Sequence, residues 1–407
     1  MSSAKDLTSG QTSSLFTLPR EILVIIFGQL KETDLLRVSK TCHHLKDVAR
    51  DPELWKKVTL TYEKIQNKNE ACRNHVSRCK ILREIFITGE EKEIRSDKIM
   101  AVVMKAKDTL TTINLSPCFA GLSKSSIEKI SDMSQLTHLA VGGDKLGPEV
   151  IAALARLTEL RSLKVHGIKC RNFVGGNMAA LVDLFSTLKK LEEVEIKMNR
   201  NYPSDLVVRS LVDNNPNLHH LDISSTSLHP SFTLLMTINE LSSSSLILLA
   251  DKCPQLTYIG IGNLNLFSST SIIKLVSSCP KLKYANFEGT IVDDTTLAMT
   301  SNKCPDLEYI KISNCRMITQ EGLETFVYLA YAANLKCLDI SDDFMSQMIS
   351  SPHFLKRLRH DLPNLKIKSE VDVYDHDDSS YDSDSDDDYA TLMGYAGLLF
   401  RWHCCLM

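Results

Sequence analysis

A short motif recurs along most of the chain and constrains its fold more than any other feature. The pattern L-x-x-L-x-L, with Ile, Val, Ala or Phe at some positions, begins ten times, at Leu82, Leu110, Leu136, Leu160, Leu191, Leu218, Leu256, Leu282, Leu307 and Leu335. Most steps between these starts are 24 to 31 residues long. Each motif predicts a short strand with its apolar side chains on one face, and one unit cannot bury that face alone. The units therefore have to stack, which predicts an α/β fold: a curved solenoid with a parallel sheet inside and helices outside.

The segments between the motifs predict the returning helices of this solenoid. Apolar residues recur at helical spacing in Ser125–Met133, Glu149–Leu157, Met178–Leu188, Leu206–Asp213, Ser269–Ser278, Thr295–Lys303 and Thr319–Ala330. The step from Leu218 to Leu256 is anomalous because it is 38 residues long, and the excess falls within His229–Leu241. An extra helical turn packed on the rim and a lid over a ligand surface are both compatible with this apolar insertion.

Several predicted helices are followed by a proline. The junctions are Cys253-Pro254, Cys279-Pro280, Cys304-Pro305 and Asn215-Pro216. Proline ends a helix and forces an extended entry into the next strand, and we expect the small Cys to be buried against neighbouring repeats. Together with the leucine motif, this device resembles the cysteine-containing subclass of leucine-rich repeats, which commonly follows an F-box. The resemblance implies Asn or Cys at the ninth motif position, as at Cys118, Asn199 and Cys315. Asp144, Thr226, Thr290 and Asp343 could substitute chemically, whereas Ile168 and Leu264 depart from the pattern.

The stretch from Leu15 to Val58 precedes the array and predicts three helices. Pro19 stands where a first helical turn would begin, and apolar residues follow it at helical spacing. Three helices in about 45 residues are too few to bury all of this apolar surface by themselves. A cap on the first repeat of the array is one use for that surface.

The order L-P-x-E-I-L, I-F, D-L-L-x-x-S-x-x-C and L-W in this stretch closely resembles an F-box. In that family the remaining apolar face binds the small adaptor subunit of cullin-RING ubiquitin ligases. The resemblance implies an adaptor-binding face formed by Leu18, Pro19, Ile22, Leu23, Ile26, Phe27 and Leu35. Because a solenoid needs its first repeat covered, we expect the part around Trp55 to cap the array, and the face around Ile22 and Phe27 to remain for a partner.

The third position of each motif points out of the predicted sheet on its concave side. It carries His220 and then tyrosine in three consecutive repeats, and since neighbouring strands lie about 4.8 Å apart, the rings are expected to form a ladder. Tyr is favoured at interfaces, but it also suits a half-exposed strand position. Our hypothesis places a protein substrate on this surface, with contacts from His220, Tyr258, Tyr284, Tyr309, Asn286, Glu288, Lys311 and Asp339.

Composition argues against several other classes of protein. The net charge of −3 hides an acidic stretch, Glu370–Asp388, with one Glu and nine Asp, and the rest of the chain carries +7. No Lys/Arg stripe with interleaved aromatics indicates nucleic-acid binding. The twelve cysteines lack zinc-site spacing and no secretory signal is visible, which predicts reduced thiols. No catalytic, metal or cofactor motif stands out, so we expect a non-catalytic protein without a cofactor.

Two features lie beyond the array. Val371–Asp388 is predicted to be disordered by composition, and Ser379, Ser383 and Ser385 each have Asp three residues later, a pattern that acidophilic kinases prefer. The sequence ends Cys404-Cys405-Leu406-Met407, which resembles a C-a-a-X box with Met favouring farnesylation of Cys404. Because one lipid anchors a protein only weakly, the apolar Ala390–Trp402 or acylation of Cys405 would have to assist.

These features predict an order of segments along the chain. Residues 1–14 are a disordered N-terminus, 15–60 the F-box, 61–81 a connector, 82–368 the repeats, 369–389 the acidic tail and 390–407 an apolar C-terminus. The resemblance implies a substrate-recognition subunit of an SCF-type ubiquitin ligase, with the adaptor, a cullin and a protein substrate as partners. It would act in the cytoplasm, and on the cytosolic side of membranes if Cys404 is farnesylated. A non-degradative binding scaffold is the alternative, and co-purification of the adaptor separates the two.

Overall fold

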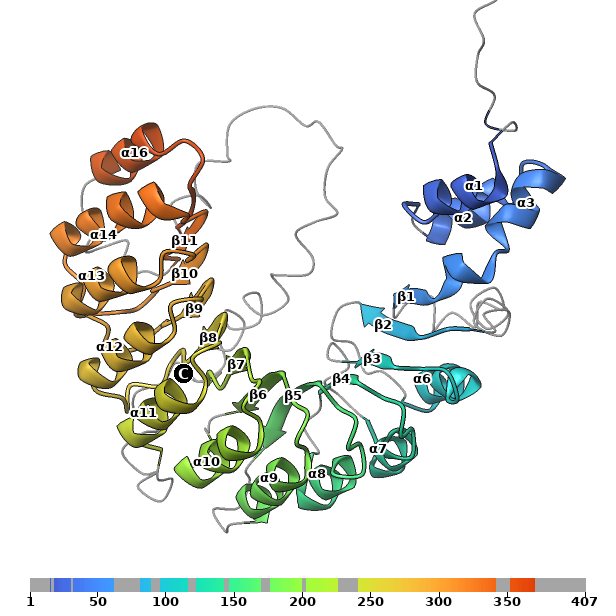
Figure 1. Ribbon diagram of the computed structural model, residues 1–407, viewed down its shortest axis with the longest axis horizontal. Coiled ribbons are helices and arrows are strands. Elements are labelled where there is room, and N and C mark those ends of the chain that lie inside the picture. The colour runs from blue at the N-terminus through green and yellow to red at the C-terminus, as the bar shows by residue number, and fades with distance from the viewer. Residues whose placement is uncertain are drawn as a thin grey trace, which may run out of the picture.

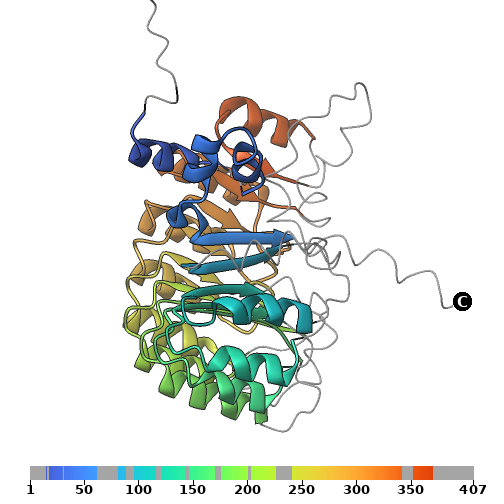
Figure 2. The same cartoon turned by 90° about the vertical axis from the view of Figure 1, so that its right-hand side faces the viewer.

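The computed structural model describes residues 15, 18–30, 32–61, 81–88, 96–115, 122–142, 146–169, 176–199, 203–225, 241–341 and 352–369. These residues form an open arc with strands along its inner side and helices along its outer side (Figure 1). In the turned view the strands of successive repeats lie beside one another across the arc (Figure 2). A small helical unit stands at one end and helix α16 (Pro352–Asp361) at the other. This architecture confirms the predicted fold class, a curved leucine-rich-repeat solenoid.

One parallel sheet runs through the described residues, and its twelve strands follow one another in chain order. They are β1 (Lys57–Thr61), β2 (Glu84–Thr88), β3 (Thr112–Leu115), β4 (His138–Gly142), β5 (Ser162–Lys169), β6 (Glu193–Asn199), β7 (His220–Asp222), β8 (Tyr258–Gly260), β9 (Tyr284–Asn286), β10 (Tyr309–Lys311), β11 (Cys337–Asp339) and β12 (Lys366–Lys368). The ten motifs supply β2 to β11, and equivalent motif positions pair across the sheet. The motif leucines, such as Leu110 and Leu282, are buried in one continuous core.

The array extends one strand beyond the predicted motifs at each end. Val58 of β1 pairs with the second-position Ile85 and follows Trp55 at the motif spacing. Ile367 of β12 pairs with the second-position Leu338, and Leu362 and Leu365 precede it. Trp55, Val58, Leu362, Leu365 and Ile367 are buried in the same core as the leucines of the predicted motifs. The F-box boundary expected at residue 60 therefore falls inside β1, and the sheet begins within the N-terminal stretch.

Helices return the chain along the outer side of the arc. They are α6 (Ser96–Val103), η3 (Met104–Ala106), α7 (Lys124–Ser131), α8 (Pro148–Leu154), α9 (Gly176–Thr187), α10 (Asp205–Asn214), α11 (Ser243–Lys252), α12 (Ser269–Ser278), α13 (Asp294–Lys303) and α14 (Gln320–Ala333), followed by α16. The seven predicted helices overlap α7 to α10 and α12 to α14, and the predicted bounds of α12 agree at both ends. The insertion expected within His229–Leu241 lies outside the described residues, except for the buried Leu241.

The Cys-Pro junctions end α11, α12 and α13 as predicted, and their cysteines are buried. The Cys279 thiol donates to the carbonyl oxygen of Cys253 over 3.6 Å, and the Cys304 thiol to that of Val276 over 3.4 Å. Burial raises the pKa of the Cys253 thiol to about 11 and those of Cys279 and Cys304 to about 12. All three thiols are therefore protonated and packed rather than nucleophilic, and those of Cys279 and Cys304 link neighbouring repeats.

Asn215 makes the corresponding link one repeat earlier, through an amide. Its Oδ1 accepts from the Leu191 N–H at 2.8 Å, and its Nδ2 donates to the Leu211 carbonyl oxygen at 3.0 Å, with the side chain buried. We expect Asn215→Ala to lower the free energy of unfolding by about 2 kcal/mol, because it leaves a buried N–H and a buried carbonyl without these partners. Urea denaturation measures this. Replacement of the exposed Asn217 by Ala is the control, and an equal loss in both variants would contradict the assignment.

The N-terminal helical unit consists of α1 (Arg20–Phe27), α2 (Glu32–Val38), α3 (His43–Ala49) and η2 (Pro52–Trp55). Pro19 is the N-cap of α1, and Cys42 caps α3 by accepting the Leu45 N–H. The Trp55 indole is buried, and its Nε1 donates to the Ala49 carbonyl oxygen at 2.7 Å. Trp55 lies two residues before the start of β1. The unit thus shares its core with the first strand, as expected for a segment that caps the solenoid.

Candidate functional site

Helix α1 carries apolar side chains on two opposite faces. Leu23 and Phe27, four residues apart, are buried in the core of the helical unit. Ile22, Ile25 and Ile26 lie on the other face and are 42%, 64% and 40% exposed. A helix that is apolar on both faces normally has both faces covered, so the isoleucine face is available to a partner.

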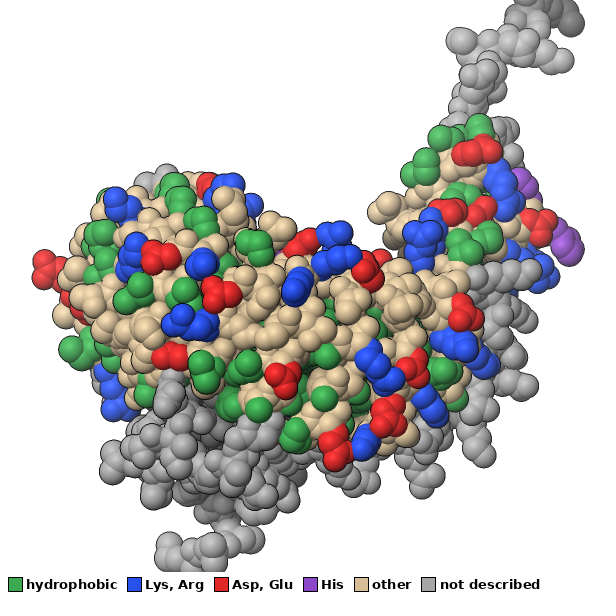
Figure 3. All heavy atoms as spheres, turned by 60° about the horizontal axis from the view of Figure 1, so that its bottom comes forward, with side chains coloured by type: hydrophobic (Ala, Val, Ile, Leu, Met, Phe, Trp, Pro, Cys, Tyr) green, Lys and Arg blue, Asp and Glu red, His purple; other side chains and the backbone are tan. Residues whose placement is uncertain are grey.

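The neighbouring segments also carry exposed apolar side chains. Leu36 of α2 and Leu15 are also exposed, as is Pro19, while Leu18 is half-buried. We call Ile22, Ile25, Ile26 and Leu36 the isoleucine patch. Hydrophobic side chains stand among charged ones on the helical unit, which is separated from the far end of the arc by a hollow (Figure 3).

Three of the seven residues expected on the adaptor-binding face are not on the surface. Leu23, Phe27 and Leu35 are buried, because each packs on the inner side of its helix against the core of the unit. A polar substitution at Phe27 would therefore disturb the helical unit itself rather than only remove a surface contact. Sequence reasoning also missed Ile25 and Leu36. Ile25 lies three residues from Ile22, so helical periodicity alone places both on one face.

The orientation of α1 is set by contacts with the far end of the unit. The Arg20 Nη2 lies 2.9 Å from Asp51 Oδ2, and Asp51 also caps η2 through the Glu53 N–H. Because η2 leads directly into β1, α1 is tied to the start of the sheet. The isoleucine patch is therefore held in a defined position relative to the array.

A row of stacked rings occupies the concave face of the C-terminal half of the array. His220 and Tyr258 have ring centroids 3.8 Å apart, and the Tyr258–Tyr284 and Tyr284–Tyr309 pairs are each 4.2 Å apart. The two tyrosine pairs are parallel within 6° and 2°. This confirms the predicted ladder, which follows from equivalent positions on adjacent parallel strands. We call these four residues the ring ladder.

Buried carboxylates hold both ends of the tyrosine part of the ladder. The Tyr309 hydroxyl donates to Asp339 Oδ2 at 2.8 Å, and the Tyr258 hydroxyl to Asp222 Oδ2 at 3.4 Å. Burial, reinforced by neighbouring charges and hydroxyls, raises the pKa values of Tyr258 and Tyr309 well above 10, so both phenols stay protonated donors. The hydroxyls are engaged within the face, which leaves the ring edges as its contact surface.

Asp222 is a buried anchor that sequence reasoning missed. Its Oδ1 accepts the Ser224 N–H at 2.9 Å, and its Oδ2 lies 3.3 Å from Lys197 Nζ. The carboxylate lies across β8 over Gly260, where an added Cβ would come within 2.4 Å of Asp222 Oδ1. Glycine at 260 therefore makes room for this carboxylate beside the ring ladder. Asp222 and Gly260 occupy the same motif position in adjacent repeats and pair directly between β7 and β8, and this was the available signal.

His220 stacks on Tyr258 and also contacts the carboxylate of Glu195. This carboxylate contacts the Lys164 ammonium, His220 Nε2 at 3.2 Å and His166 Nε2 at 3.3 Å. Burial opposes the charge on Glu195, but the hydrogen bonds from His166, His220 and Lys164 outweigh it and hold the pKa of this carboxyl far below its ordinary 4.5. The group is ionised and positions the first ring of the ladder.

This lowered pKa makes a prediction about acid stability. The folded pKa of Glu195 lies below the unfolded value of 4.5, so its stabilising effect is present above pH 4.5 and is lost as pH falls toward the folded pKa. We expect Glu195→Gln to cost about 2–3 kcal/mol at pH 7, because it leaves Lys164 without its carboxylate. The difference from wild type should shrink at about pH 4 and below. Urea midpoints across this range measure it; a difference independent of pH would contradict it.

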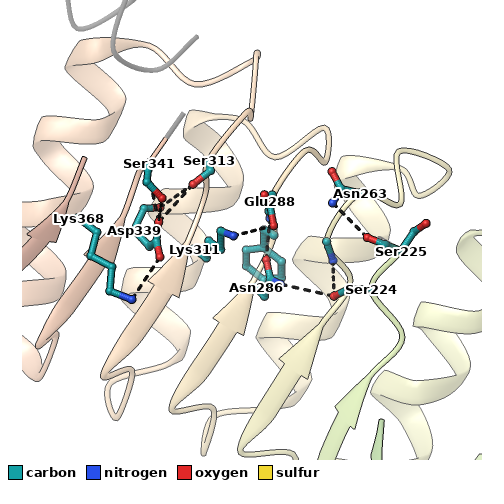
Figure 4. Close-up of polar contacts among 12 residues, drawn as sticks. Ser224, Ser225, Asn263, Asn286, Glu288, Lys311, Ser313, Asp339, Ser341 and Lys368 are labelled. Atoms are coloured by element: carbon teal, nitrogen blue, oxygen red, sulfur yellow. Dashed lines mark hydrogen bonds and ion pairs between the residues drawn. The ribbon is translucent and has the colours of Figure 1, made fainter. Parts of the chain in front are cut away.

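The remaining residues expected to bind substrate lie at the carboxyl ends of β9 to β11 (Figure 4). Lys311 Nζ is 2.8 Å from Glu288 Oε2, and Asn286 Oδ1 accepts the Glu288 N–H at 3.1 Å. The structure thus brings Asn286, Glu288 and Lys311 together as one cluster beside the ladder. Asp339 is buried instead, where it accepts from Tyr309 and Ser341 and lies 3.5 Å from Lys368 Nζ. Its position fits a support of the face rather than a direct contact.

The ninth motif positions of two neighbouring repeats lie near the same edge. The Thr290 hydroxyl donates to the Phe287 carbonyl oxygen at 2.7 Å, and the Cys315 thiol donates to the same oxygen at 3.0 Å. The predicted substitution of Thr for Cys or Asn at the ninth position is therefore confirmed at Thr290. These groups tie each loop to the next and fix the ends of the concave strands.

Several expectations fall on residues that the structure does not describe. Cys404, Ser379, Ser383 and Ser385 are among them, as are the acidic tail and most of the predicted connector. Within the described part of the chain, no group of three or more His, Cys, Asp or Glu is arranged to hold a metal ion. A search of the same residues for a helix long and apolar enough to cross a bilayer finds none. The described surfaces provide apolar contacts at the isoleucine patch, and aromatic and polar contacts at the ring ladder.

Comparison with known proteins identifies the N-terminal unit. The model of the F-box-like family matches residues 15–61, which contain α1 to α3, η2 and β1. A search of curated proteins finds no match. The chain therefore combines an F-box-like segment with a leucine-rich-repeat solenoid.

Two solved structures are similar to parts of the chain. The crystal structure of the Rad7 and Elc1 complex in yeast is similar with a TM-score of 0.49 at 12% identity, over 87% of this chain and 94% of that chain. The leucine-rich-repeat-containing protein LegL7 from Legionella pneumophila is similar with a TM-score of 0.39 at 13% identity, over 76% of this chain and 100% of that chain.

Proposed function

We propose that this chain is the substrate-recognition subunit of an SCF-type ubiquitin ligase. The observation that carries the proposal is the isoleucine patch: α1 of an F-box-like segment keeps three isoleucines exposed while its opposite face forms the core. Exposed apolar patches on otherwise soluble folds mark sites of protein association. The adaptor would bind this patch, and a cullin would join through the adaptor.

The connection between the patch and the array supports the rest of the proposal. Trp55 and Val58 share one core with the repeats, and η2 passes directly into β1. A substrate held on the concave face would therefore have a defined position relative to the adaptor. The chain supplies binding surfaces and orientation, and the bond-forming chemistry would belong to other subunits.

Affinity capture tests this function. The full chain, purified from cells of its own species, is expected to retain the adaptor and a cullin in amounts comparable to its own. Mass spectrometry of the captured complex gives these ratios. Capture of other proteins without adaptor or cullin would contradict a role in a ubiquitin ligase and would favour a non-degradative scaffold.

Membrane attachment is a separate proposal that rests on the terminal Cys404-Cys405-Leu406-Met407. Farnesylation of Cys404 would add a hydrophobic anchor and place the ligase on the cytosolic side of membranes. We expect Cys404→Ser to move the protein from the membrane fraction to the soluble fraction, while Cys118→Ser does not. Equal partitioning of the wild type and Cys404→Ser would contradict the anchor.

A further inference from the structure

The described side chains of the concave face include equal numbers of positive and negative groups. Among the described side chains at alternate strand positions, and at the positions that continue them, are six lysines and six carboxylates and no arginine. The lysines are Lys57, Lys164, Lys197, Lys311, Lys366 and Lys368. The carboxylates are Glu84, Glu193, Glu195, Asp222, Glu288 and Asp339. The described charges of this face therefore balance and leave no excess of one sign to attract a strongly charged partner.

The charges near the ring ladder are also paired individually across neighbouring strands. Lys164 contacts Glu195, Lys197 lies 3.3 Å from Asp222, Lys311 lies 2.8 Å from Glu288, and Lys368 lies 3.5 Å from Asp339. At the N-terminal end of the sheet, Lys57 Nζ stands 4.5 Å from the centroid of the Phe86 ring, and Lys366 has an interaction partner as well. The positive side chains of this face are thus already engaged.

These pairs are costly to open, because three of the four carboxylates are buried. Glu195, Asp222 and Asp339 are each less than a tenth exposed. Withdrawing the lysine from such a group would leave a buried charge without its partner. Recognition of a phosphate uses free Arg or Lys donors. A phosphorylated ligand would therefore have to compete with intact ion pairs for every lysine beside the ladder.

The ring ladder offers the complementary kind of contact. Its centroids span about 12 Å, a length that an extended peptide covers with about four residues. The rings are rigid, since each is stacked on the next, and the hydroxyls at both ends of the tyrosine row are hydrogen-bonded to carboxylates. Such pre-ordered aromatic edges bind apolar and neutral polar groups with little loss of side-chain entropy.

We propose that the ring ladder binds an extended, unphosphorylated segment of the substrate that carries no net charge. The paired lysines and carboxylates around it leave no free charge for a phosphorylated or strongly charged segment, and neutral polar groups of the bound segment can hydrogen-bond to the exposed edges of these pairs. This inference rests on the proposed function, because it names the class of substrate that the same receptor surface would take.

The test uses the full chain bound to its adaptor and two displayed peptide libraries. One library contains random unmodified segments, and the other has a fixed central phosphoserine or phosphothreonine. We expect enrichment of unmodified peptides with net charge near zero, and their binding should change less than about threefold between low and high salt. Enrichment of phosphopeptides, enrichment of strongly charged peptides, or no enrichment would each overturn the proposal.

Two pairs of variants show where on the concave face the selected peptides bind. If one variant folds poorly, the other pair still tests the proposal. Tyr284→Ala should weaken the selected peptides about tenfold or more, while Tyr284→Phe, which keeps the stacked ring, should stay within about threefold. Glu288→Gln frees Lys311 and should shift selection toward acidic or phosphorylated peptides, and Lys311→Gln should shift it toward basic ones. Peptides that bind the Ala variant unchanged, or selections that both charge variants leave unaltered, would overturn the proposal. Adaptor binding in the same preparation separates this failure from failure of the ligase function.

Discussion

Replacement of Ile22 by Asp is expected to weaken adaptor binding about a hundredfold while leaving the fold intact. Ile22 lies in the isoleucine patch and is 42% exposed, so the carboxylate can be hydrated in the free chain. In the complex the same carboxylate would be buried in an apolar interface, and central residues of such interfaces contribute about 2–4 kcal/mol. Calorimetric titration with purified adaptor measures the loss.

The chain offers a closely matched control for this variant. Ile247 is 43% exposed and belongs to α11, which lies on the outer side of the array, away from the helical unit (Figure 1). Ile247→Asp makes the same chemical change at the same exposure and should leave adaptor affinity unchanged. Phe27→Asp is the opposite case, because Phe27 is buried and its substitution should unfold the helical unit. Equal adaptor affinity for the wild type and Ile22→Asp would remove the isoleucine patch as the docking site.

Gly260→Ala is expected to lower the free energy of unfolding by about 2–3 kcal/mol. The added Cβ would lie 2.4 Å from Asp222 Oδ1, and the carboxylate cannot easily move aside. It is buried and held by the Ser224 N–H, by Tyr258 and by Lys197. Relief of the clash would break these contacts and release one end of the ring ladder.

A double-mutant cycle distinguishes this clash from a general effect of alanine. In the Asp222→Ala background the obstructing carboxylate is gone, so Gly260→Ala should cost less than about 1 kcal/mol. Gly147→Ala is a second control, since no atom lies within 4 Å of a Cβ placed there. Denaturant unfolding of the four chains gives the coupling energy. A coupling near zero would mean that Asp222 is not what requires glycine at position 260.

Repeats of nearly constant length made most of the array predictable. The motif leucines define β2 to β11, and the apolar spacing between motifs located seven helices to within a few residues. The ring ladder followed from the same regularity, because equivalent positions on adjacent parallel strands must lie beside each other. The leucine motif is weaker at the two terminal strands. Trp55 replaces the first leucine at β1, and Leu362 replaces the Cys or Asn that precedes proline in several other repeats.

The parts of the site that escaped prediction depend on which neighbour each side chain meets. Periodicity identified Leu23, Phe27 and Ile22 as apolar helix residues, but only the packing of α1 on α3 and η2 decides which of them are buried. Asp222 and Asp339 stand at strand positions that face the concave side, yet tyrosines and lysines of adjacent repeats cover them. Their burial follows from contacts between residues about 30 positions apart, which no local pattern reports.

Hydrogen exchange with and without purified adaptor shows directly which surface the adaptor covers. We expect the adaptor to protect amides in Arg20–Phe27 and Glu32–Val38, which carry the isoleucine patch, and to leave the strands from β7 to β11 unchanged. This result would show that the helical unit docks the adaptor while the ring ladder stays free for a substrate. Protection of the concave strands by the adaptor, or no protection anywhere in the helical unit, would contradict this division of the two surfaces.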